Sequence, residues 1–279
     1  MKRENEAESR HRRSAENLRL LTYDTPFAVR EAYVRLRTNL MFCVNGQGNP
    51  CTTFVITSGN PAEGKSITAA NVSISFAMLG KKTLLIDADM RKPAQQNVWH
   101  IRQSSTGLCN YLAGIGELGL GHVDGIPLSI AFCGVIPPNP SELLSTRRMR
   151  SFLKSASELY DYVIVDTAPV NTVADAQILS PMVDGVLLVT RSRRSTAAEL
   201  GMAIEAVEHS GGNLCGVVVN DMDMKASGYS YRYKQDRYGQ SRENGYGHKY
   251  GYGYGYGSNN RVSYGQDYGS AGQSERGEG

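Results

Sequence analysis

The chain has 279 residues, with 30 lysines and arginines against 27 aspartates and glutamates, and a net charge of +3. That balance is too even to favour nucleic acid or an anionic membrane as a partner. The five cysteines are scattered with no C-x-x-C pair, which favours free thiols over disulfides or a metal site. No apolar run reaches the ~18 residues that cross a bilayer, and the charged N-terminus lacks the apolar core of a signal peptide. We therefore expect a cytoplasmic protein with one α/β domain and appended segments.

Composition divides the chain into three parts. Residues 1–21 are polar and charged, which predicts a flexible N-terminal arm. Residues 22–227 contain the apolar segments of a folded domain. Residues 228–279 hold eleven of the sixteen tyrosines, spaced by glycine and polar residues, with almost no aliphatic side chain. So few apolar groups cannot offset the entropy of folding, and we predict a disordered tyrosine-rich and glycine-rich tail.

Apolar segments of two kinds alternate along the domain. Asp24, Thr25 and Pro26 mark the start of the first helix. The predicted strands cover residues 54–57, 83–86, 162–165, 185–190 and 216–219. The predicted helices cover residues 29–42, the segment after residue 66, one segment that starts at residue 141 and bears arginines 147, 148 and 150, and residues 196–209. Residues 94–134 show only short helices or loops between glycines. The alternation predicts a mostly parallel sheet with helices on both faces.

A glycine-framed loop lies between the first predicted strand and its helix. Residues 59–66 fit G-x-x-x-x-G-K-[ST], in the strand–loop–helix context that a phosphate-binding loop requires. Backbone N–H groups of such a loop bind phosphate oxygens, while Lys65 reaches the β- and γ-phosphates and Ser66 binds Mg²⁺. The residues expected to bind nucleotide here are Gly59, Asn60, Glu63, Gly64, Lys65, Ser66 and Ile67. We predict a P-loop NTPase fold; an ordinary strand-to-helix turn is the alternative.

Three acidic residues follow predicted strands, at the edge where parallel sheets bind ligands. Asp166 ends the run YVIVD and suits a carboxylate that holds the metal through water, with a helix cap or turn as the alternative. Asp87 and Asp89 follow an earlier strand. One of this pair suits the metal or its water and the other an acceptor hydroxyl, although exposed acids at a strand end would look the same. The predicted metal ligands are Ser66, Asp87 and Asp166, and the predicted catalytic residues are Lys65, Asp87 and Asp89.

Polar residues also follow the last two strands. Asn220 is placed either to meet the adenine edge or to cap its strand. Arg191, Arg193 and Arg194 border the nucleotide or an acidic partner surface, or else form a solvated loop. The five histidines are dispersed and show no metal-binding spacing. Of these residues, only Asn220 is assigned to nucleotide binding.

The tail supplies candidate phosphoryl acceptors. A tyrosine hydroxyl is a poor nucleophile until it lies beside a base, and a glycine-spaced segment lets many tyrosines reach one site in turn. A sticky or adhesive tract is the alternative for the tail by itself. The predicted acceptors are Tyr246, Tyr250, Tyr252, Tyr254, Tyr256, Tyr264 and Tyr268.

Taken together, these motifs resemble the bacterial tyrosine kinases of capsule and exopolysaccharide synthesis, the CpsD/CapB type. The resemblance covers residues 25–220 and rests on the strings SGNPAEGKS, LLIDADMRKP and VIVDTAPV, with GLCNYLAG, GVIPPNPSELL and the tyrosine cluster in support. It implies an ATP-dependent protein-tyrosine kinase with ATP and Mg²⁺ as cofactors. The residues it assigns to phosphate, magnesium and catalysis are Lys65, Ser66, Asp87, Asp89 and Asp166.

The resemblance also implies partners and a location. The tail would be autophosphorylated in trans within a ring-like homo-oligomer. The implied partners are a separate membrane adaptor of the polysaccharide co-polymerase type, which activates the kinase, and a cognate tyrosine phosphatase. Sugar-nucleotide enzymes are implied as further substrates, and the adaptor would recruit the kinase to the inner face of the plasma membrane. Val34 stands where the family's oligomerisation motif has an arginine, and Ala62 stands where many relatives have glycine. A positive φ at Ala62 would strain the loop.

Two other functions are compatible with a phosphate-binding loop. A partitioning ATPase of the ParA/MinD kind shares the sheet, but it places a lysine directly after the first loop glycine, where this chain has Asn60. Such an ATPase also has no use for a tyrosine-rich tail. A nucleotide-gated adaptor without catalytic activity is the third reading. The tyrosines and the paired acids Asp87 and Asp89 favour the kinase.

Overall fold

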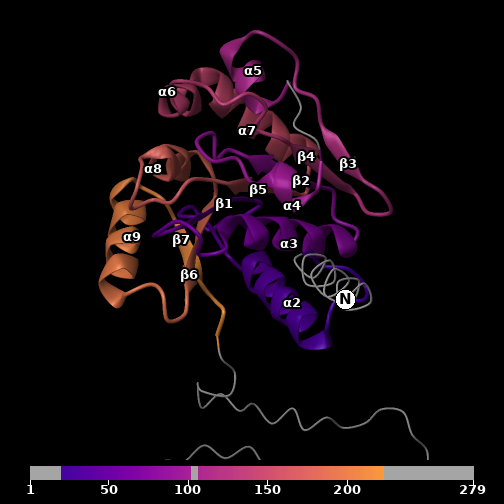
Figure 1. The fold of residues 1–279 in the computed structure, drawn as a ribbon, viewed down its shortest axis with the longest axis vertical. Coiled ribbons are helices and arrows are strands. Elements are labelled where there is room, and N and C mark those ends of the chain that lie inside the picture. Colours follow the sequence, from indigo (N-terminus) through magenta and orange to yellow (C-terminus); the bar gives the residue numbers. More distant parts are fainter. Residues whose placement is uncertain (1–19, 102–105, 223–279) are drawn as a thin grey trace, which may run out of the picture. The chain divides into compact units, whose positions relative to one another are not determined.

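The computed structural model describes residues 20–101 and 106–222, and its elements are named as in Figure 1. The predicted tail and its acceptor tyrosines, and almost all of the predicted N-terminal arm, lie outside the described residues. Within the described residues no helix is both long and apolar enough to cross a membrane. All five cysteines are described and all are free, as predicted.

A seven-stranded sheet forms the centre of the domain, in the order β3-β4-β2-β5-β1-β6-β7. Its pairings are parallel except for β3 against β4. The strands are β1 (Thr53–Ser58), β2 (Thr83–Asp87), β3 (Gly121–Val123), β4 (Leu128–Ala131), β5 (Tyr162–Asp166), β6 (Gly185–Arg191) and β7 (Leu214–Asn220). The mostly parallel α/β fold that the sequence predicts is confirmed.

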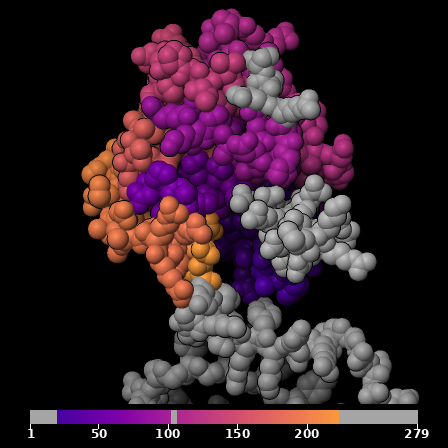
Figure 2. Space-filling view, viewed as in Figure 1, coloured from indigo at the N-terminus to yellow at the C-terminus, as the bar shows by residue number. Residues whose placement is uncertain are grey.

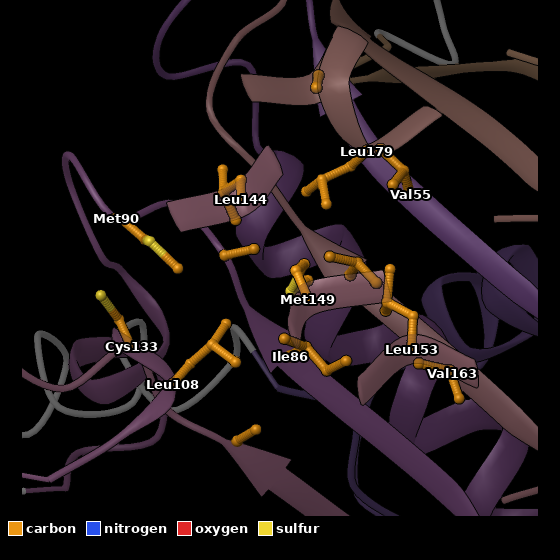
Figure 3. Close-up of a cluster of buried hydrophobic side chains, with 14 of the residues drawn as sticks. Val55, Ile86, Met90, Leu108, Cys133, Leu144, Met149, Leu153, Val163 and Leu179 are labelled. Carbon is orange, nitrogen blue, oxygen red and sulfur yellow. The ribbon is translucent and has the colours of Figure 1, made fainter. Parts of the chain in front are cut away.

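Helices cover both faces of this sheet (Figure 1). They are α2 (Phe27–Met41), α3 (Lys65–Met78), α4 (Gln95–Val98), α5 (Leu108–Ala113), α6 (Pro140–Ser145), α7 (Arg147–Leu159), α8 (Asp175–Leu179), the 3₁₀ helix η1 (Ser180–Met182) and α9 (Ala197–His209). Alternate residues of one strand enter different cores: Phe54 packs with residues of α2 and α3, whereas Val55 packs with residues of α7, α8 and α9. Figure 3 shows Val55 and Leu179 in this second core, together with Leu153 and Val163. Strands buried on both faces explain why their sequences are continuously apolar.

Two sequence predictions were wrong. The stretch 94–134, expected to hold only short helices and loops, contains β4, which is buried along its whole length and pairs with β2. The single helix expected from residue 141 is two helices, because Thr146 adopts an extended conformation between α6 and α7. The Thr146 hydroxyl accepts a hydrogen bond from the Met149 N–H at 3.2 Å and so starts a new helix.

Strand register brings the predicted acids together. In the parallel pair of β2 and β5, Asp87 lies directly opposite Asp166. In the pair of β1 and β5, Asp166 lies opposite Ile56, two residues before β1 ends at Ser58 and the phosphate-binding loop begins. The carboxyl ends of three neighbouring strands therefore supply the loop and two carboxylates at one edge of the sheet.

At the other ends of the strands, Asp184, which directly precedes β6, connects β6 to the start of β1. Its carboxylate accepts hydrogen bonds from the N–H groups of Thr52 and Thr53 at 3.0 and 2.9 Å and from both threonine hydroxyls. Asn45 donates a further bond at 3.3 Å. Partial burial works against the charged form, but these hydrogen bonds outweigh it and lower the pKa of Asp184.

We expect Asp184→Ala to reduce the free energy of unfolding by about 3 kcal/mol at pH 7, because several donors to one carboxylate lose their acceptor. Since the folded pKa lies below the unfolded one, this stabilisation is complete above the unfolded pKa and disappears as the pH falls through the folded pKa. Denaturant unfolding at pH 7 and pH 3 measures both effects. Asp124→Ala, at an exposed position between β3 and β4, is the matched control. A loss equal at the two pH values would contradict the carboxylate's role.

Candidate active site

The phosphate-binding loop connects β1 to α3. Gly64 has φ +94°, and a Cβ there would lie 2.5 Å from the Asn220 amide nitrogen, so only glycine fits. Ala62 has φ 63°, which confirms that a non-glycine residue holds a left-handed position in this loop. No side chain caps α3, which begins at Lys65. Its first-turn N–H groups are thus available to an anion, as in other helices that bind phosphate.

Glu63 holds the loop in shape. Its carboxylate accepts a hydrogen bond from the Asn60 N–H at 2.9 Å and another from the Ser195 hydroxyl. Its backbone carbonyl accepts one from the Asn220 amide at 2.9 Å. Asn220 also donates to the Thr68 hydroxyl at 3.3 Å, so its amide contacts both the loop and α3. These bonds connect the loop to β7 and to the segment that follows β6.

A pocket of about 340 Å³ lies beside the loop. Its lining residues are Asn60, Pro61, Glu63, Arg194 and Glu199. Arg191 lies nearby, pairs with Asp221 at 2.8 Å and reaches the Ala62 carbonyl at 3.4 Å, so it contacts the loop and is not simply solvated. Figure 2 shows the violet surface of the early residues between the orange surface of the α9 region and the magenta and salmon surface of the middle of the chain.

The ammonium of Lys65 lies among the predicted acids. Its Nζ is 2.7 Å from Asp89 Oδ2 and 3.4 Å from Asp166 Oδ1, and it donates to the Ser66 hydroxyl at 3.0 Å. Lys65 and Ser66 are 8 % and 9 % exposed, and the two aspartates are 3 % or less. The structure therefore brings the predicted phosphate, metal and catalytic residues into one buried cluster.

Burial and mutual repulsion dominate the electrostatics of this cluster. Burial, followed by the charge of Asp166, raises the pKa of Asp87 well above its ordinary value. Burial also raises the pKa of Asp166, against the opposing effects of Lys65 and of hydrogen bonds from Ser66 and Gln95. Burial alone would lower the pKa of Lys65, but the charges of Asp166 and Asp89 more than compensate and raise it. Buried carboxylates with strongly shifted pKa values are typical of a functional site.

Gln95 is a member of this cluster that sequence reasoning missed. Its side-chain amide donates to Asp166 Oδ2 at 2.8 Å and to the Ser66 carbonyl at 3.0 Å. Its backbone N–H donates to Asp87 Oδ2 at 3.0 Å. The other oxygen of Asp87, Oδ1, is buried and has no hydrogen-bond partner among the described residues. No sequence pattern marks a glutamine in a short helix as part of such a site.

A second missed group holds the loop that carries Asp89. Arg91 forms an ion pair with the buried Asp175 at 2.8 Å and donates to the Ser141 hydroxyl at 2.8 Å. Ser141 in turn donates to Asp175 at 2.6 Å. The Lys92 N–H donates to Asp89 Oδ1 at 3.0 Å. The strings DADMRKP and PPNPSELL are thereby joined through contacts that their spacing in the sequence does not reveal.

The cluster fits a hydrated Mg²⁺ ion. Mg²⁺ is usually bound by one or two carboxylates together with waters and phosphate oxygens, and it prefers oxygen ligands. Ser66, Asp87 and Asp166 offer such oxygens, and the unpartnered Oδ1 of Asp87 is suited to a cation or a donor. Over residues 20–101 and 106–222, no group of three or more His, Cys, Asp or Glu side chains could hold a metal by itself.

Comparison with known proteins gives consistent results. A family model described as an AAA domain matches residues 55–209, which is more than half of the chain and includes the acidic cluster. The chain is 34 % identical over 226 residues to the putative tyrosine-protein kinase CapB of Staphylococcus aureus, covering 78 % of this chain and 96 % of CapB. It is 38 % identical over 211 residues to the tyrosine-protein kinase YwqD of Bacillus subtilis, covering 75 % and 88 %.

The fold is also similar to a solved structure of this group. The kinase domain of the Escherichia coli tyrosine kinase ETK superposes with a TM-score of 0.65 and 31 % identity, covering 81 % of this chain and 87 % of that domain. The similarity therefore extends over most of each relative in both sequence and structure.

Proposed function

The chain belongs to the bacterial protein-tyrosine kinases of the CpsD/CapB type, and from that premise we propose that it uses Mg²⁺ and ATP to phosphorylate the tyrosines of its own C-terminal tail. The observation that carries the proposal is the buried cluster in which Lys65 and Ser66 meet Asp87, Asp89 and Asp166 beside the phosphate-binding loop. Nucleotide binding follows from the fold and the family; the cofactor identities, the residue roles and the acceptor belong to the proposal.

The loop and the cluster divide the chemistry between them. Backbone N–H groups of the loop and the Lys65 ammonium bind the β- and γ-phosphate oxygens. Ser66, Asp87 and Asp166 hold Mg²⁺, which when bound neutralises charge on those oxygens. The tyrosine oxygen forms a bond to the γ-phosphorus while the bond to the β–γ bridging oxygen breaks, so that ADP leaves. The acceptor's proton passes to a carboxylate of the pair Asp87 and Asp89.

The regulatory setting is proposed from the resemblance. We propose that the tail is phosphorylated in trans within a ring-like homo-oligomer, with Tyr246, Tyr250, Tyr252, Tyr254, Tyr256, Tyr264 and Tyr268 as acceptors. A membrane adaptor of the polysaccharide co-polymerase type would recruit the kinase to the inner face of the plasma membrane and activate it, and a cognate phosphatase would reverse the modification. Sugar-nucleotide enzymes would be further substrates. Cycles of this modification would regulate the synthesis and export of capsular or extracellular polysaccharide.

Mixing two full-length variants tests both the activity and its direction. One chain carries Lys65→Met and an intact tail; the other keeps Lys65 but has the seven acceptor tyrosines replaced by phenylalanine. With ATP, Mg²⁺ and the cytoplasmic segment of the adaptor, we expect phosphotyrosine on the tail of the Lys65→Met chain, identified by mass spectrometry. The Lys65→Met chain alone is the control and should remain unlabelled.

Three outcomes separate the alternatives. Release of inorganic phosphate without phosphotyrosine would indicate an ATPase and contradict the proposal. Nucleotide binding without either product would indicate a gated adaptor. Labelling of wild type that does not occur in the mixture would support the kinase but reject transfer in trans.

A further inference from the structure

Gln95 joins three elements that meet at the site. The side chain is fully buried at the start of α4. Its Nε2 donates to Asp166 at the end of β5 and to the Ser66 carbonyl in α3. Its backbone N–H donates to Asp87 at the end of β2. One residue thus fixes the relative positions of both predicted metal-binding carboxylates and of the helix that follows the phosphate-binding loop.

Trp99 determines which way the Gln95 amide points. The indole Nε1 donates to Gln95 Oε1 at 3.2 Å. An indole nitrogen can only donate, so the amide oxygen of Gln95 must face Trp99 and the NH₂ group must face the carboxylates. A flipped amide would place its oxygen against Asp166 and leave the indole N–H facing a donor. Trp99 is also the single tryptophan of the chain, so tryptophan fluorescence reports on the surroundings of this one residue.

Gln95 occupies one oxygen of each carboxylate and leaves the other for chemistry. On Asp166, Oδ2 accepts from Gln95 while Oδ1 faces Lys65 at 3.4 Å. On Asp87, Oδ2 accepts from the Gln95 N–H while the buried Oδ1 has no partner among the described residues. A neutral donor suits this position because it orients the carboxylates without cancelling the charge that a cation requires.

We propose that Gln95 is a positioning residue for the Mg²⁺–nucleotide site, that it presents one oxygen each of Asp87 and Asp166 to the metal, and that Trp99 keeps it in the working orientation. The inference rests on the proposed function for the identity of the metal and nucleotide. Residues that hydrogen-bond to metal ligands orient them, and their loss typically weakens metal affinity or activity by roughly 10–100-fold.

Gln95→Met, a near-isostere without donors, tests this in the full-length protein. Titration calorimetry with ADP, with and without Mg²⁺, should show the affinity gained from Mg²⁺ reduced by about 10-fold or more, because the carboxylates are no longer held. The affinity for ADP without Mg²⁺ should stay within about 2-fold, since the substitution leaves Lys65 and the backbone N–H groups of the loop in place. In the kinase assay kcat should fall roughly 10–100-fold, with a smaller change in KM for ATP.

The adjacent Gln96 is a matched control. It is 7 % exposed, and its amide nitrogen has no hydrogen-bond partner in the described part of the chain. Gln96→Met should therefore bind Mg²⁺ and ADP as the wild type does. Trp99→Phe, at a half-buried position, keeps the ring and removes only the orienting N–H. This variant should reduce the affinity gained from Mg²⁺ by a smaller factor, roughly 3-fold. It tests the proposal independently if Gln95→Met folds poorly.

Trp99 emission gives an independent readout. In the wild type it should change when ADP and Mg²⁺ bind together, and in Gln95→Met this change should disappear. The inference is overturned if Gln95→Met retains the full Mg²⁺ gain, or if it loses ADP affinity equally with and without Mg²⁺, as general structural damage would produce. ADP binding needs no phosphoryl transfer, so a wild type that forms no phosphotyrosine would count against the proposed function and not against Gln95.

Discussion

Replacement of Lys65 by methionine should reduce phosphorylation of the tail by at least about 10³-fold. The ammonium of Lys65 lies at the start of α3, within 3.4 Å of Asp166 and 2.7 Å of Asp89. Methionine preserves the volume of the side chain but removes the positive charge that the transferred phosphoryl group needs. Because the site is buried, water cannot replace that charge. Quantitative mass spectrometry of tail tyrosines measures the loss.

The same variant should change stability with pH in a defined direction. The pKa values of Asp87 and Asp166 are raised by burial in the folded protein, so between the unfolded value of about 3.9 and the folded values the native state binds more protons. Stability contributed by these groups therefore falls as pH rises through that window. Without the Lys65 cation the fall should be larger, about 2–3 kcal/mol near pH 8, and should recover towards pH 5.

Lys154→Met is the control for both measurements. Lys154 is exposed on α7, so its loss should affect neither the labelling nor the pH dependence of unfolding. Full tail labelling by Lys65→Met would show that the phosphate contact is made elsewhere. A stability of Lys65→Met that rises from pH 5 to pH 8 would show that the buried aspartates are not the groups that respond.

The parts of the site that the sequence predicts are those encoded locally. The glycine pattern around Lys65 and the acids that follow apolar strands are short-range signals, and the parallel topology then places strand ends at one edge. The strand register then brings the two carboxylates together, because Asp87 and Asp166 lie opposite one another in β2 and β5. The positive φ of Ala62 is likewise a property of the loop itself.

The parts that the sequence does not predict depend on long-range contacts. Gln95 contacts Asp166 across 71 residues, and Arg91 contacts Asp175 across 84. A glutamine in a four-residue helix carries no periodic signal. The strand β4 was missed because it has only four residues, one of them Ser129, which is too few to distinguish a strand from a loop. Its pairing with β2 makes it a strand. Thr146 interrupts a helical pattern through a cap that only the fold shows.

Asp87→Asn should separate catalysis from stability more sharply than any other single change in the cluster. Asp87 is fully buried, burial and the charge of Asp166 raise its pKa, and its Oδ1 lacks a hydrogen-bond partner among the described residues. Asparagine can keep the bond from the Gln95 N–H and removes one buried negative charge. We expect kinase activity to fall about 10²–10³-fold, because a metal-binding and proton-accepting oxygen is lost.

In the absence of nucleotide, the same variant should be more stable than the wild type by about 2 kcal/mol at pH 8, or roughly 5 °C in Tm. Asp89→Asn provides the contrast: Asp89 is paired with Lys65 at 2.7 Å, so its neutralisation removes an attraction and should not stabilise the protein. Calorimetry and tail labelling of both variants test the expectation. If Asp87→Asn is less stable than the wild type by 1 kcal/mol or more, the buried charge of Asp87 is not a source of strain. If Asp87→Asn is more stable than the wild type but inactive, the negative charge of Asp87 destabilises the folded protein and is required for catalysis.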